Sequence, residues 1–244
     1  SMVTRPRTHP LLSKFDTDCG EKYIWTTFSD DQIDLNFENP KVLIKMVEVL
    51  LFYLEKGASW IRLDAVGFMW KEAGTTSIHL DKTHELIKLF RDVVSTTSPG
   101  TILITETNVP HKDNISYFGD GTDEAQMVYQ FPLPPLVIYT LMYGDSSVIS
   151  NWAKGLDTPT DEVTYFNFLA SHDGIGINPI RGIVPEEKIL DMVGNLEKDG
   201  ALVSNKKNPD GSLSPYEVNS SYINAVSKKS DSEETKIRKF LNAQ

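Results

Sequence analysis

Strand-like and helix-like segments alternate along the middle of this chain. The strand-like segments are rich in β-branched and aromatic residues and cover residues 59–63, 101–105, 125–131 and 163–170. Helices are predicted over residues 41–55, over 82–95 and after the prolines at 132, 134 and 135. Such alternation is typical of βαβ units, so the sequence predicts an α/β fold with a parallel sheet. Apolar side chains lie almost all round the 41–55 helix, which predicts that it is well buried.

Three of the predicted strands lead into an acidic residue. Asp64 follows the first strand, Glu106 follows the second, and Asp173 comes shortly after the fourth. The carboxyl ends of parallel strands meet at one edge of a sheet, so we expect these three carboxylates to lie together. Each acidic residue alone could be only a helix cap or a turn former. Their coincidence favours a catalytic site.

Paired carboxylates are suited to breaking a glycosidic bond, because one can attack the anomeric carbon while the other protonates the leaving oxygen. Arg62 is two residues before Asp64, so on a strand both side chains point to the same face. A neighbouring guanidinium would keep Asp64 ionised, as a nucleophile requires. His172, beside Asp173, could donate a hydrogen bond to a sugar hydroxyl.

Composition excludes several classes of protein. Acidic residues outnumber basic ones by 34 to 24 and the net charge is −10, which argues against a nucleic-acid-binding protein. The single cysteine, Cys19, excludes a disulfide scaffold and a cysteine-based zinc site. No apolar run reaches the length of about 18 residues that a membrane span needs, and no signal-peptide pattern precedes the first strand. We therefore expect a cytoplasmic protein that binds neither metal, membrane nor nucleic acid.

Three motifs resemble those of the α-amylase superfamily, glycoside hydrolase family 13. They are Arg62-Leu63-Asp64-Ala65-Val66, Thr105-Glu106 and Ser171-His172-Asp173. The resemblance implies a TIM (β/α)8 barrel, with Asp64 as nucleophile, Glu106 as acid/base and Asp173 as stabiliser of the transition state. It also implies that Arg62 and His172 contact the sugar.

Further motifs resemble the sucrose phosphorylase branch of that superfamily. They are Arg5-Pro6-Arg7, residues 25–34, residues 71–75, residues 133–136 and Asp173-Gly174-Ile175-Gly176. This branch implies retaining phosphorolysis, with inorganic phosphate as co-substrate, no cofactor, and α-glucose 1-phosphate as product. It implies that Phe28 and Gln32 lie at the glucosyl pocket and that Arg7 meets phosphate or the leaving sugar. It places Tyr216 and Glu217 in a mobile loop at the acceptor site.

Some positions depart from that branch. Phe68 stands where most amylases have Lys or His, and Asn108 and Glu217 replace the His and Gln of sucrose phosphorylases. Residues 106–111 and 178–182 are more similar to the glucosylglycerate phosphorylase subgroup. A hypothesis follows that Arg181 meets the glycerate carboxylate, because a guanidinium suits that anion. The alternative is that Arg181 is a solvated loop residue.

The resemblance also implies a partial barrel. Residues 1–39 match the end of an insertion domain before barrel strand 4, residues 40–173 match strands 4–7 with their helices, residues 174–220 match an insertion after strand 7, and residues 221–244 form a helical end. Helices are predicted at 186–199 and 231–242, and a turn at 208–212 lies in an irregular, exposed stretch. A TIM barrel needs eight strands, so we expect an inactive fragment whose other barrel half belongs to the same polypeptide.

Three classes of function remain open. The first is a phosphorylase of a small α-glucoside, either glucosylglycerate or sucrose. The second is an α-glucoside hydrolase or transglycosidase, which shares the three carboxylates but needs no phosphate. The third is a non-catalytic fragment or carbohydrate-binding remnant. Phosphate dependence separates the first two classes.

Overall fold

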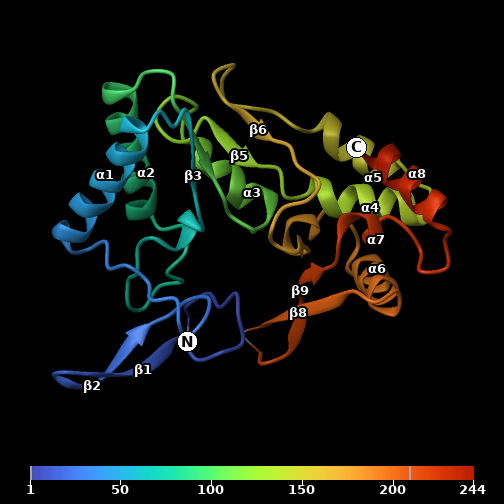
Figure 1. Ribbon diagram of the computed structural model, residues 1–244, viewed down its shortest axis with the longest axis horizontal. Coiled ribbons are helices and arrows are strands. Elements are labelled where there is room, and N and C mark those ends of the chain that lie inside the picture. Colours follow the sequence, from blue (N-terminus) through green and yellow to red (C-terminus); the bar gives the residue numbers. More distant parts are fainter. Residues whose placement is uncertain (1, 209) are drawn as a thin grey trace.

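A four-stranded parallel sheet forms the centre of the computed structural model, which describes residues 2–208 and 210–244 (Figure 1). Its strands, in spatial order, are β3 (Trp60–Leu63), β4 (Ile102–Thr105), β5 (Met127–Tyr129) and β6 (Thr164–Phe166). Leu103 of β4 is the register partner of Ile61, and Val128 of β5 is the partner of Thr105 and Tyr165. The predicted parallel sheet is confirmed, although β6 is shorter than the expected 163–170.

Helices follow the strands as the alternation predicts. The chain runs through α1 (Pro40–Glu55), α2 (Asp81–Thr97), α3 (His111–Asn114), α4 (Leu133–Tyr143) and α5 (Ser147–Lys154), with 3-10 turns η1 (Val66–Phe68) and η2 (Ile115–Phe118). The Asn39 side chain caps α1 by accepting a hydrogen bond from the Lys41 N–H. Leu50, Phe90, Val94 and Leu103 form the core between α1, α2 and the sheet.

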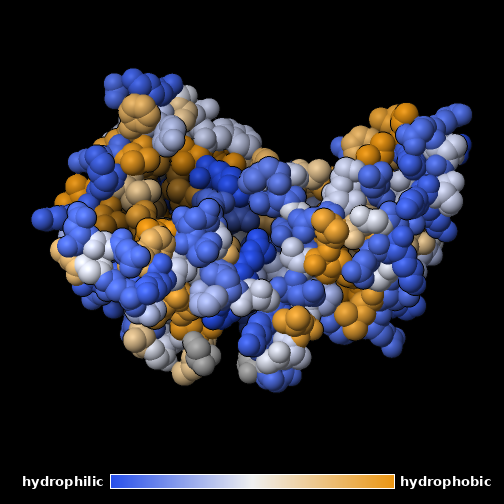
Figure 2. Space-filling model, turned by 60° about the horizontal axis from the view of Figure 1, so that its bottom comes forward, coloured by the Kyte–Doolittle hydropathy of each residue, from blue (hydrophilic) through white to orange (hydrophobic). Residues whose placement is uncertain are grey.

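The expected burial of α1 is wrong. Within α1, Leu50 is buried, but Ile44, Phe52 and Tyr53 are each more than half exposed. The helix packs with one face against α2 and the sheet, and its other apolar faces have no cover among the described residues. An apolar groove of about 440 Å³ runs between α1 and β3. Figure 2 shows hydrophobic residues gathered around a hollow on this side of the molecule.

The N-terminal segment is an antiparallel hairpin that projects away from the sheet (Figure 1). It consists of β1 (Leu12–Thr17) and β2 (Gly20–Trp25). β2 ends at Trp25, and the two residues after it, Thr26 and Thr27, are almost fully buried.

A second core lies beyond β6, in the C-terminal part of the chain. It contains β7 (Ile175–Gly176), η3 (Asn178–Ile180), α6 (Glu186–Lys198), β8 (Leu202–Lys207), β9 (Leu213–Asn219), α7 (Tyr222–Ala225) and α8 (Glu233–Ala243). The strands pair antiparallel in the order β7-β9-β8. Ile177, Ile189, Met192 and Val218 are fully or almost fully buried between α6 and this small sheet.

The prediction of an irregular, exposed stretch before the last helix is therefore wrong. Residues 202–219 form a β-hairpin, and Tyr216, Glu217 and Val218 on β9 are buried. The predicted turn at 208–212 lies at the tip, where the Asn208 N–H donates to the Ser212 carbonyl; Pro209 is outside the described residues. Among the helices of the described segments, none is long and apolar enough to cross a bilayer.

Candidate active site

The guanidinium of Arg62 lies close to all three carboxylates that follow the strands. Arg62 Nη1 lies 2.7 Å from Asp64 Oδ1, and Nη2 lies 3.9 Å from both Glu106 Oε2 and Asp173 Oδ2. The carboxylates follow β3, β4 and β6, so the parallel sheet brings them to one edge as the sequence predicts. Arg62 also lies over the Tyr129 ring, at 5.4 Å from its centre. The arrangement holds two exposed carboxylates beside a buried one.

Glu106 is the least exposed member of this group. Its side chain is only 12% exposed, and this burial raises the pKa of its carboxyl group to about 7. The Asp64 and Asp173 carboxylates raise the pKa further, whereas the Ala65 N–H and Arg62 oppose the rise. A carboxyl group with this pKa can both give and take a proton near neutral pH, which general acid/base chemistry requires.

The turn after Asp64 aims a backbone donor at Glu106. Ala65 adopts a left-handed conformation with φ of 48°, which a non-glycine residue rarely does. Its N–H thereby donates a hydrogen bond of 3.0 Å to Glu106 Oε2. Backbone strain at a site like this persists only where the surroundings enforce it. The turn thus couples the position of Asp64 to that of Glu106.

A cavity of about 470 Å³ opens over these carboxylates. Most of the side chains predicted for the site line it: Arg7, Phe28, Gln32, Asp64, Glu106, Asn108, His172, Asp173, Tyr216 and Glu217. They come from the N-terminal segment, the strand ends and β9, which are far apart in the sequence. His172 Nε2 lies 3.4 Å from Asp173 Oδ2, so its ring stands at the cavity rim beside that carboxylate.

Arg7, Tyr216 and Glu217 form one wall of the cavity. Arg7 Nη1 lies 3.5 Å from Glu217 Oε2, and its guanidinium lies over the Tyr216 ring at 5.3 Å. Burial raises the pKa of the Tyr216 hydroxyl above its usual range. Arg7 therefore brings positive charge to the cavity despite the acidic composition of the chain.

Two glycines in and just before β7 let the backbone approach Asn108 and Asn219 closely. A Cβ on Gly176 would lie 2.5 Å from Asn108 Oδ1, and a Cβ on Gly174 would lie 2.5 Å from Asn219 Oδ1. Asn108 Oδ1 is buried and has no hydrogen-bond partner among the described residues. Such an acceptor is available to a donor that enters the cavity.

Arg62 contacts the carboxylates without lining the cavity, and Arg181 lies away from both. The Arg181 guanidinium forms an ion pair with Glu186 and donates to the Asn178 side chain at 3.3 Å and to the Pro215 carbonyl at 3.0 Å. These contacts tie η3, α6 and β9 together. A contact between Arg181 and a substrate carboxylate would require them to open.

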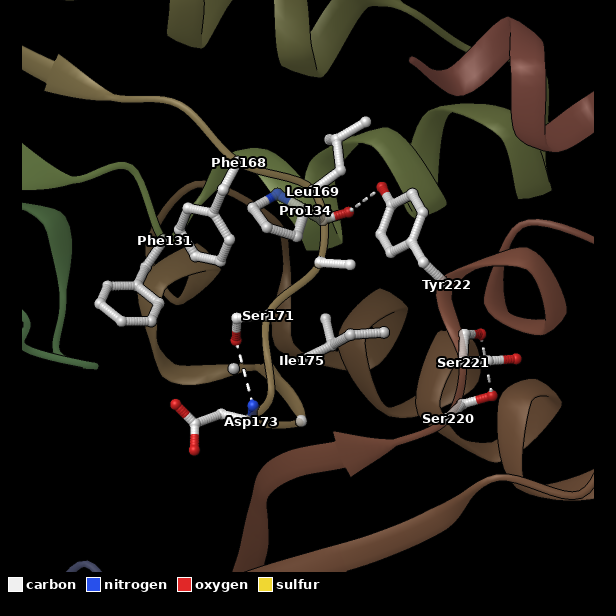
Figure 3. A pocket seen from close by; sticks show the side chains of 13 residues that line it. Phe131, Pro134, Phe168, Leu169, Ser171, Asp173, Ile175, Ser220, Ser221 and Tyr222 are labelled. Atoms are coloured by element: carbon white, nitrogen blue, oxygen red, sulfur yellow. Dashed lines mark hydrogen bonds between the residues drawn. The ribbon is translucent and has the colours of Figure 1, made fainter.

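A smaller cavity of about 260 Å³ lies behind the Asp173 loop (Figure 3). It shares Phe131, Asp173 and Gly174 with the larger cavity. Sequence reasoning missed Phe131, although its place just after β5, at the same edge of the sheet, was a signal. The Asp173 N–H donates to Ser171 Oγ at 3.1 Å, which shapes the loop between the cavities. Residues 2–208 and 210–244 contain no cluster of three His, Cys, Asp or Glu side chains that could hold a metal ion.

Comparison with known proteins gives close relatives. The family model described as alpha amylase, catalytic domain, matches residues 13–175. The chain is 57% identical over 244 residues to the glucosylglycerate phosphorylase of Escherichia coli (strain K12), and 51% identical over 245 residues to that of Allomeiothermus silvanus. Both alignments cover all of this chain and 44% of the relative. The chain therefore spans less than half the length of these relatives.

A solved structure shares the fold. The sucrose 6F-phosphate phosphorylase from Thermoanaerobacter thermosaccharolyticum superposes with a TM-score of 0.80 at 24% sequence identity. The superposition covers 92% of this chain and 46% of that protein. The four-stranded sheet and its helices thus correspond to part of a larger barrel.

Proposed function

Because this chain belongs to the α-amylase family, we propose that its site transfers a glucosyl group from a small α-glucoside to inorganic phosphate. The observation that carries the proposal is the contact of one guanidinium with three carboxylates, one of which has a pKa of about 7. Two of these carboxylates are the pair that a retaining mechanism requires. The relatives named glucosylglycerate phosphorylase support glucosylglycerate as the first donor to test, with sucrose as the second.

The first proposed step is attack by Asp64 on the anomeric carbon. A bond forms between Asp64 and C1 while the bond from C1 to the leaving oxygen breaks, and Glu106 gives that oxygen its proton. Arg62, 2.7 Å from Asp64, holds the nucleophile in position by an ion pair until it reacts. His172 donates a hydrogen bond to a sugar hydroxyl, and the Asp173 carboxylate stabilises the positive charge that develops on the ring.

The second proposed step returns the glucosyl group to phosphate. A phosphate oxygen attacks C1, its proton passes to the Glu106 carboxylate, and the bond to Asp64 breaks, which gives α-glucose 1-phosphate. Arg7 is the cation on the cavity wall that would attract phosphate. Phe28 and Gln32 would contact the glucosyl ring, whereas Asn108, Tyr216 and Glu217 would face the leaving group. The reaction needs abundant phosphate, which is consistent with a cytoplasmic location.

The test is glucose 1-phosphate formation by the full-length protein, with and without phosphate. We expect phosphate-dependent product from glucosylglycerate and a loss of about 10⁴-fold or more in the Asp64→Asn variant. Product from sucrose instead would assign the acceptor site to fructose. Free glucose that forms without phosphate would support the alternative, an α-glucoside hydrolase or transglycosidase.

We also propose that these 244 residues are inactive by themselves. Among the described residues, strands β3 and β6 each have a neighbouring strand on one side only, and a barrel of this kind closes through eight strands. A longer polypeptide, as in the relatives, would supply the remaining strands. Turnover by the isolated chain at the rate of the full-length protein would refute this.

A further inference from the structure

A buried ion pair ties the segment before α1 to the turn after Asp64. Lys71 Nζ lies 2.6 Å from Asp34 Oδ2, and the two side chains are only 18% and 11% exposed. Lys71 Nζ also donates a hydrogen bond of 2.5 Å to the Phe68 carbonyl, in the turn that follows Asp64. Burial lowers the pKa of Lys71, and the contact with Asp34 opposes that effect. The ammonium group is therefore enclosed and held at two points.

Asp34 also makes hydrogen bonds to residues at the start of its own loop. Asp34 Oδ1 accepts a hydrogen bond of 2.7 Å from the Thr27 N–H, and Oδ2 accepts one of 2.6 Å from Thr27 Oγ1. The Asp34 N–H donates to the Trp25 carbonyl at 3.0 Å. These bonds form a closed loop over residues 27–34 whose base is anchored by Lys71.

The closed loop carries two residues of the catalytic cavity. Phe28 packs edge-on against Phe68, with ring centres 5.4 Å apart, and Gln32 lines the cavity beside it. Phe28, Gln32 and Phe68 also line the apolar groove on the other side, together with Asp34 and Lys71. The ion pair thus lies behind a thin wall that separates the catalytic cavity from the groove.

We propose that Asp34 and Lys71 are positioning residues that lock this wall against the turn after Asp64. The lock, defined as the Asp34–Lys71 pair with its bonds to Thr27 and Phe68, holds Phe28 and Gln32 where the glucosyl ring binds. It also keeps water in the groove away from the reacting carbon. This role in sugar binding rests on the proposed function, but the lock itself does not.

The lock is tested first by hydrogen exchange in the full-length protein. In Lys71→Met, peptides that cover residues 27–34 should exchange about tenfold faster, because local opening exposes the Thr27 amide. Asp34→Asn should act in the same direction, and Lys71→Arg should keep protection. The matched control is Lys14→Met, which breaks the Lys14–Glu21 pair of equal length, 2.6 Å, on the exposed hairpin. Unchanged exchange in Lys71→Met would overturn the lock.

Kinetics then test its role at the site. We expect Lys71→Met to raise the KM for the glucosyl donor about tenfold, to lower kcat less, and to increase the ratio of free glucose to glucose 1-phosphate. Lys71→Arg should keep KM, kcat and the product ratio close to those of the unmodified protein. Lys14→Met should change none of these three quantities. Faster exchange with unchanged KM and product ratio would show a purely structural pair and overturn the positioning role. Absence of phosphorolysis in the unmodified protein would reject the proposed function, while the exchange result would still stand.

Discussion

At the scale of single residues, burial and the neighbouring carboxylates of Asp64 and Asp173 raise the pKa of Glu106, and Arg62 only partly opposes them. Because the pKa of its carboxyl group is raised to about 7, the acid form that protonates the leaving group is lost as the pH rises above 7. We expect kcat/KM of the full-length protein to fall along a basic limb centred near pH 7. Glu106→Gln should remove the limb together with most of the activity. A basic limb two units higher would contradict this assignment.

The raised pKa of Glu106 also makes a prediction about stability. The folded state holds its proton more tightly than the unfolded state, so this contribution is full below pH 4.5 and is lost as the pH rises through 7. Glu106→Gln removes the buried charge and should therefore increase the unfolding free energy at pH 8 by about 3 kcal/mol, with little effect at pH 4. Chemical denaturation at both pH values measures the difference. Exposed Glu85→Gln is the control, and equal effects at the two pH values would contradict the prediction.

Only some of the residues at the site could be predicted from the sequence. Asp64, Glu106 and Asp173 were predictable because strand ends follow a local pattern, and strand periodicity alone placed Arg62 beside Asp64. The Asp34–Lys71 pair was not, because it joins two loops whose packing no local pattern encodes. The fully bonded guanidinium of Arg181 depends likewise on the fold of β9, which the sequence did not indicate.

At the scale of elements, a buried aromatic network supports η1 beneath the nucleophile. His79 Nδ1 lies 2.6 Å from the Tyr117 hydroxyl, and His84 stacks on the Tyr117 ring while its Nδ1 lies 2.9 Å from Glu124 Oε2. The His79 N–H donates to the Gly67 carbonyl at 3.1 Å. Tyr117 and Glu124 are almost fully buried. The network thus holds η1, which follows the left-handed turn at Ala65.

Gly67 is the contact point of that network. A Cβ on this glycine would lie 3.0 Å from the Tyr117 hydroxyl and 3.3 Å from the His79 ring. Gly67→Ala should therefore lower the unfolding free energy by about 1–3 kcal/mol. A Cβ on Gly194, in α6, would have no atom of the described residues within 4 Å, so Gly194→Ala should instead raise the unfolding free energy by about 0.5–1 kcal/mol. Denaturant unfolding of both variants measures these changes. Equal changes in the unfolding free energy of the two variants would exclude the close contact at Gly67 as the cause.

The sequence predicted which segments form helices better than it predicted what those helices pack against. Residues 41–55 and 82–95 were predicted as helices because their apolar spacing is helical, and both exist. Burial of α1 was predicted wrongly because periodicity reports which faces are apolar and not which faces find a partner. The β8–β9 hairpin was missed because its strands lack strict alternation and contain Pro215.

At the scale of the whole molecule, the apolar faces without cover lie together on one side. The groove between α1 and β3 is lined by Phe37, Met46, Val49, Tyr53 and Ile61, and the outer edge of β3 has no neighbouring strand within residues 2–208 and 210–244. Contiguous apolar surface of this kind marks an interaction site, and an open strand edge adds unpaired backbone groups. In the isolated chain, this side is available to another copy.

We therefore expect the isolated chain to self-associate through the groove. The double variant Val49→Lys and Tyr53→Lys puts two charges on its wall, and both positions are at least one-third exposed, so the unfolding free energy should change by less than about 1 kcal/mol. Sedimentation velocity should show association in the unmodified chain and a shift toward monomer in the double variant. Leu213→Lys, on the exposed start of β9, should leave association unchanged. A chain that stays monomeric at all concentrations, or an equal effect of Leu213→Lys, would mean that the groove is not what drives copies of this chain together.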